Sequence, residues 1–198
     1  MKPQKAVATV LVLFCSVMLW GQDRDKPSTP EERQKALTLT KKLERNPLGP
    51  EAVADRKWLT NWIIEIPDIT VPVCDELLKP MLMGQMSQYR YSRELIAQQL
   101  AGSMAYLIEH PQEATKVKSG AEQDDFAINK AGLDSALNAY EAIVKNNAPG
   151  SKWAPLEELM KKRQAGSLDD YVRAATLKCV TGDTVTARLR SPVCKALD

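Results

Sequence analysis

The sequence predicts an all-α protein, a single-domain bundle of about six or seven helices with one proline-rich connector. Apolar residues recur every three or four positions through most of the chain, which is the period of an amphipathic helix. Prolines, glycines and capping residues mark the ends of these segments. Only the segment 181–189 has β character, through Val185, Thr186 and Ala187. These observations together favour the all-α class.

The first two predicted helices lie on either side of a turn at 46–50 that contains two prolines and a glycine. Thr29 is a capping residue, Pro30 suits a first turn, and the two acids that follow complement the positive end of a helix. The second helix should begin after Pro50 and stop at Pro67. Its apolar face consists of Leu59, Trp62, Ile63 and Ile66.

A rigid, partly buried connector is predicted between Ile66 and Cys74. Pro67 and Pro72 each lack a backbone N–H and push the preceding residue into an extended conformation. An ordinary helix therefore cannot continue through this segment.

Further helices are expected at 75–83, 92–110 and 124–146, then from Pro155 to Gly166 and from Ser167 to Cys179. Both long helices carry an apolar stripe at helical spacing. Small residues in the first of them should let a neighbouring helix approach closely: Ala97, Ala101, Gly102 and Ala105.

The first 21 residues are predicted to be an export signal. Lys2 and Lys5 precede an apolar run from Ala6 to Trp20, and the small residue Gly21 follows, as in a cleavable secretory signal. The alternative is an uncleaved membrane anchor, although this run is shorter than the roughly 17 to 25 residues that span a bilayer. We expect a protein that is periplasmic or secreted after cleavage, and in contact with a membrane only if the signal is kept.

The remaining chain divides into a flexible leader at 22–30, an all-α domain at 31–180 and a C-terminal tail at 181–198. Removing Lys2 and Lys5 with the signal takes the 27 basic side chains to 25, which equals the 25 acidic ones. Because nucleic-acid binding draws on clustered positive charge, we expect no nucleic-acid partner.

Three cysteines remain after the signal: Cys74, Cys179 and Cys194. A bridge between Cys74 and Cys179 closes a loop of about 105 residues, worth on the order of 4.7 kcal/mol in the chain-entropy model, against about 3 kcal/mol for Cys179 with Cys194. We favour the first pairing, because Cys74 lies in a rigid turn and Cys179 ends a helix. The second pairing stays open as the alternative.

No cofactor or metal site is predicted, because the chain has one histidine, no CxxC pair and no phosphate-binding glycine loop. Cys74 with His110 is a conceivable nucleophile pair, but an oxidising compartment favours a disulfide over a thiolate. A glycan or peptide hydrolase would instead need a carboxylate pair. The available acids are Glu94, Glu109, Asp124, Asp125, Asp169 and Asp170.

A candidate binding surface is predicted between the third and fourth helices. Methionine side chains adapt to variable partners, and tyrosine with arginine is typical of interface anchors. The residues are Met81, Met83, Met86, Tyr89, Arg90 and Tyr91. The alternative is a loop whose aromatic rings cover the core while the arginines stay in water.

Two resemblances accompany these patterns. The run Leu133, Ala136, Leu137, Ala139, Tyr140, Glu141, Ile143 and Pro149 resembles the second helix of a tetratricopeptide repeat, in one copy only. The run from Trp58 to Cys74, with Tyr89, Tyr91, Ser92 and the segment 108–111, resembles small exported helical proteins of bacteria that have no assigned activity. That resemblance implies a compartment and a fold class, and no function.

We therefore expect a non-enzymatic protein of the cell envelope that binds a protein or another envelope component. The alternatives are the carboxylate hydrolase and a small periplasmic stress chaperone that exposes its methionine and aromatic surface.

Overall fold

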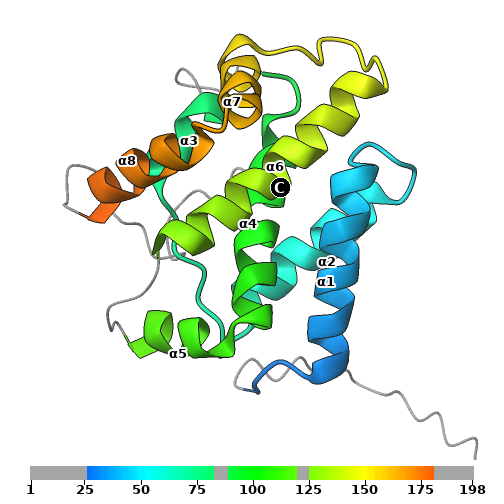
Figure 1. The fold of residues 1–198 in the computed structure, drawn as a ribbon. Coiled ribbons are helices and arrows are strands. Elements are labelled where there is room, and N and C mark those ends of the chain that lie inside the picture. The colour runs from blue at the N-terminus through cyan, green and yellow to red at the C-terminus, as the bar shows by residue number, and fades with distance from the viewer. Residues whose placement is uncertain (1–25, 83–88, 120–124, 181–198) are drawn as a thin grey trace, which may run out of the picture.

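The computed structural model describes residues 26–82, 89–119 and 125–180. This part of the chain holds eight helices and no strand, which confirms the all-α prediction (Figure 1). The helices are α1 (Pro30–Arg45), α2 (Ala52–Glu65), α3 (Asp75–Leu82), α4 (Ser92–Glu109), α5 (Pro111–Ser119), α6 (Asp125–Lys145), α7 (Ala154–Gln164) and α8 (Leu168–Val180). The predicted signal, residues 22–25 of the leader and the C-terminal tail lie outside the described residues.

Helix α1 begins as its sequence predicts. The Glu32 N–H donates to the Thr29 hydroxyl at 3.2 Å, and the Thr29 N–H donates to the Glu32 carboxylate at 2.8 Å. This reciprocal pair satisfies two backbone donors that the first turn of a helix leaves without partners.

Helix α5 was not expected from the sequence. With it the described residues hold eight helices, one more than the upper end of the predicted six or seven. The His110 N–H donates to the Tyr106 carbonyl at 2.9 Å and ends α4. Pro111 then starts a new helix in the first turn, where the backbone N–H groups have no partner within the helix and a missing N–H costs little. From the sequence, His110 and Pro111 predict only the end of the preceding helix, because a proline just after a helix also acts as a stop signal.

Helices α4 and α6 cross at the centre of the molecule (Figure 1). A Cβ atom built on Gly102 of α4 would lie 2.4 Å from Cβ of Ser135, and one on Gly132 of α6 would lie 2.3 Å from Oγ of Ser103. Real Cβ atoms do not come this close to their neighbours, so the crossing requires a glycine on both helices. The expected close approach at Gly102 is confirmed.

Two hydrophobic clusters fill the interior. The first, called here the α8 core, combines buried residues of α3, the 89–91 turn, the start of α4, α6, α7 and α8. The second, called here the α1 core, combines α1, α2, the connector, the rest of α4, α5 and Ile128 of α6. Helices α4 and α6 contribute to both clusters and hold them in one fold.

The connector between α2 and α3 runs from one core to the other. Ile69 and Val71 are buried in the α1 core, whereas Cys74 is buried in the α8 core. Cys74 forms a disulfide with Cys179 near the end of α8, with 5.6 Å between their Cα atoms. The favoured pairing is thus present in the structure, and the extended connector agrees with the effect of its prolines.

Candidate functional site

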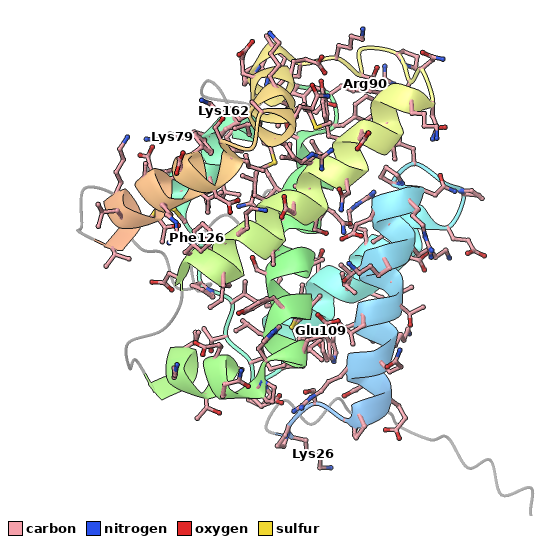
Figure 2. The ribbon with its side chains drawn as sticks, in the orientation of Figure 1. Lys26, Lys79, Arg90, Glu109, Phe126 and Lys162 are labelled. Carbon is pink, nitrogen blue, oxygen red and sulfur yellow. A yellow bond between two sulfur atoms is a disulfide. The ribbon has the colours of Figure 1, made fainter. Side chains whose placement is uncertain are left out.

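The structure contradicts the predicted binding surface around the tyrosines. Tyr89 is 3 % exposed and Tyr91 is 7 % exposed, and Met81 is fully buried in the α8 core. Arg90 is exposed (Figure 2). The remaining two residues of that prediction, Met83 and Met86, lie outside the described residues. The tyrosines and Met81, which were to contact a partner, are therefore part of the core.

Hydrogen bonds to a distant loop explain why these tyrosines are buried. The Tyr89 hydroxyl donates to the Ser151 carbonyl at 2.8 Å, and the Tyr91 hydroxyl donates to the Pro149 carbonyl at 2.9 Å. A tyrosine can enter a core at low cost when its hydroxyl finds such an acceptor. The 89–91 turn is in this way fastened to the loop between α6 and α7.

Tyr140 and Trp153 complete this aromatic cluster. The ring of Tyr89 stacks on Trp153 with centroids 5.7 Å apart and meets Tyr140 edge to face at 6.2 Å. The Tyr140 hydroxyl accepts from the backbone N–H of Trp153 at 3.1 Å and donates to the Glu157 carboxylate. Burial raises the pKa of Tyr140 above its usual value, and the hydrogen bond to Glu157 raises it further. The cluster thus has structural partners for its polar atoms.

The acids considered for hydrolysis lie at helix ends. Glu94, Asp125, Asp169 and Asp170 are in the first turns of α4, α6 and α8, where a carboxylate complements the helix dipole. Glu109 is exposed at the end of α4 (Figure 2), and Asp124 lies outside the described residues. Asp169 pairs with Lys130 at 3.5 Å.

Neither the thiol pair nor a metal site is built by the described residues. Cys74 is in a disulfide, so it offers no thiolate to His110. His110 instead places Nδ1 2.8 Å from the Tyr106 carbonyl and stacks on the Tyr106 ring. Within the described ranges no group of three or more His, Cys, Asp or Glu side chains could hold a metal ion.

Buried hydrogen bonds form a polar seam between α1, α4 and α6 that was not predicted from the sequence. The Gln98 amide donates to the Thr40 carbonyl at 3.1 Å and to the Ser135 hydroxyl at 2.7 Å. Ser135 in turn donates to the Glu44 carboxylate at 2.7 Å. The sequence hint of this seam is a polar side chain at an otherwise apolar core position. The partners of that side chain are set by the tertiary fold, so the sequence does not show them. Its hydrogen bonds fasten α1 to the α4 and α6 crossing.

Glu94 of α4 and Arg56 of α2 are two charged groups that influence each other electrostatically. One carboxylate oxygen of Glu94 is buried and accepts no hydrogen bond from the described residues. Arg56 of α2 donates to the Pro47 carbonyl at 2.6 Å. Burial lowers the pKa of Arg56, and the negative charge of Glu94 opposes that effect.

Exposed large apolar side chains lie near α2, at the end of α3 (Leu82) and at the end of α8 (Leu177 and Val180). Val53 is 74 % exposed and Ile64 is 44 % exposed, and Leu48 in the preceding turn is exposed as well. Val53 and Ile64 are eleven residues apart, about three helical turns, so they lie on the same side of α2. We call the exposed side chains Val53, Lys57, Asn61 and Ile64 the α2 outer face. The opposite side of α2 carries Leu59, Trp62 and Ile63 into the α1 core.

Comparison with protein-family models, with curated proteins and with solved structures finds no match to this chain. Among the described residues no helix combines the length and the apolar character needed to cross a membrane.

Proposed function

We propose that this protein is exported to the cell envelope and has a non-enzymatic role, binding a protein or another envelope component through the α2 outer face. The observation that supports this most is the 74 % exposure of Val53 on a helix whose other side is fully used by the core. Export is supported by the signal-like first 21 residues and by the disulfide, a bond that persists in oxidising compartments.

The composition of the α2 outer face suits a protein partner. Val53 and Ile64 offer apolar area at its two ends, and Lys57 and Asn61 offer hydrogen-bond donors between them. Interfaces commonly combine apolar contacts with polar groups that fix the register of the partner. Scattered single apolar residues occur on all protein surfaces, and Leu177 with Val180 on α8 forms a second exposed pair, so the argument depends on the exposed donors Lys57 and Asn61 that lie between Val53 and Ile64.

The experiment is photo-crosslinking in intact cells, with a photoreactive residue in place of Lys57 at the centre of the face. We expect a discrete adduct. Adding Val53→Glu and Ile64→Glu to the photoreactive variant should abolish the adduct. The melting temperature should stay within a few degrees of that of the parent, because both side chains are outside the core.

The matched control is Val180→Glu, which places the same charge at a position that is 61 % exposed on α8. This control should leave the adduct unchanged. Absence of any adduct, or an adduct that survives Val53→Glu with Ile64→Glu, would exclude the α2 outer face as the binding surface.

A further inference from the structure

Helix α8 is the last element of the described chain and packs mainly against α3, α6 and α7. It contributes Leu168, Val172, Ala175, Thr176 and Cys179 to the interior. An isolated helix of 13 residues is only marginally stable in water, so α8 depends on this packing to keep its place. The crossing of α4 and α6, which joins the two cores, is formed without it.

The polar contacts that hold α8 lie partly in the interior and partly at the surface. Asn129 donates to the Thr176 hydroxyl at 3.0 Å in the interior. The Arg173 guanidinium lies over the Phe126 ring at 3.8 Å from the ring centre, where Figure 2 shows Phe126 at the start of α6. Asp169 makes a long ion pair with Lys130 on the surface. Exposed ion pairs of this kind contribute little to stability.

The disulfide holds the end of α8 to the start of α3. Cys74 and Cys179 are 3 % and 5 % exposed, and Val180 beyond them is turned to solvent. Cys74 also ends the connector, whose other end is fixed by Asp68. The bond therefore joins α8 to a segment that is itself held in place.

We propose that the Cys74–Cys179 disulfide is a redox-sensitive lock on α8. Reduction lets α8 leave α3 and α6 while α1, α2, α4 and α6 stay folded, and it uncovers the apolar side chains of the α8 core. The close contacts at the glycine crossing are Gly102 with Ser135 and Gly132 with Ser103, so the crossing is made by α4 and α6 alone and does not need α8.

The reducing partner is a dithiol. One of its thiolates attacks a sulfur of the disulfide and releases the other cysteine as a thiolate. Its second thiolate then attacks the reductant's own sulfur in the mixed disulfide and releases the second cysteine, so that the dithiol ends as a disulfide. Two electrons and two protons pass to this chain, which gains the thiols of Cys74 and Cys179. Because both sulfurs are buried, attack requires opening of the last turn of α8, a local fluctuation.

Amide hydrogen exchange read by mass spectrometry tests the lock on the full exported chain. Cys194→Ser removes the third thiol, so that no disulfide exchange can occur, and the phosphine TCEP is the reductant. On reduction we expect exchange in α8 and α3 to become at least tenfold faster, and exchange in α1, α4 and the middle of α6 to change less than twofold. Binding of the apolar dye ANS should rise in parallel.

The double variant with Cys74→Ser and Cys179→Ser is the second arm of this experiment. It should show the fast α8 exchange without TCEP, and TCEP should then add nothing. Unchanged exchange in α8 after verified reduction would overturn the proposal. So would loss of protection in all helices together, or a double variant that does not fold, because either result makes the disulfide a support of the whole domain.

Discussion

At the scale of single residues, Asp68 joins the start of the described chain to the connector. Its carboxylate accepts from the Ser28 N–H at 2.8 Å, from the Ser28 hydroxyl at 2.7 Å and from the Arg33 guanidinium at 2.7 Å. Burial would raise the pKa of Asp68, but these donors outweigh it and hold the pKa below its usual value. Arg33 also donates to the Ser28 hydroxyl at 2.8 Å, which closes the network.

This network predicts the pH dependence of stability at Asp68. A carboxyl whose pKa is lower in the folded state stabilises the fold above its unfolded pKa, near 3.8, and loses that contribution as pH falls through the folded pKa. Asp68→Asn should cost about 1 to 2 kcal/mol at pH 7, and the difference from the wild type should shrink below about pH 4. Urea unfolding at a series of pH values measures it.

The comparison for this prediction is Asp169→Asn, which removes one partner of the exposed pair with Lys130. It should change the free energy of unfolding by no more than about 0.5 kcal/mol at any pH. An equal effect of the two substitutions would show that the Asp68 network adds nothing beyond an ordinary surface pair.

Tyr89 gives a second prediction at this scale. Tyr89→Phe keeps the ring in the aromatic cluster and removes the donor to the Ser151 carbonyl, so the buried acceptor loses its partner. We expect a loss of about 1 to 2 kcal/mol in the free energy of unfolding. Denaturant melts of the purified variant check this, and a neutral effect would mean that the hydroxyl is solvated in solution.

At the scale of helices, the crossing of α4 and α6 predicts an effect of unusual sign. Gly102→Ala in an exposed helix would stabilise by up to about 1 kcal/mol through helix propensity. Here the new methyl group would meet Cβ of Ser135 at 2.4 Å and the Ala131 carbonyl at 2.9 Å. We expect a net loss of about 1 to 3 kcal/mol in thermal or denaturant unfolding, and a stabilised variant would contradict the close approach of the two backbones.

Elements set by local chemistry were predicted well from the sequence. The cap at Thr29 and the connector between Pro67 and Pro72 follow from residues next to each other in the chain. Tyr89 and Tyr91 were predicted wrongly as surface residues, because their burial depends on carbonyls 62 and 58 residues away. The α2 outer face was missed because α2 carries apolar residues on both sides, and only packing decides which side is covered.

At the scale of the whole molecule, the connector ties the two cores and both ends of the described chain together. The Asp68 network holds the beginning of α1, and the disulfide holds the end of α8. Closing a loop of 105 residues removes much of the freedom of the unfolded chain, on the order of 4.7 kcal/mol in the entropy model.

Non-reducing peptide mapping of the protein from its native envelope fraction tests the central claim, a disulfide-locked helical domain that is exported, most directly. The account predicts a mature N-terminus near Gln22 and a single peptide pair that joins Cys74 to Cys179. A chain that keeps Met1 to Trp20 and carries Cys74 and Cys179 as free thiols would contradict both the proposed export and the lock on α8.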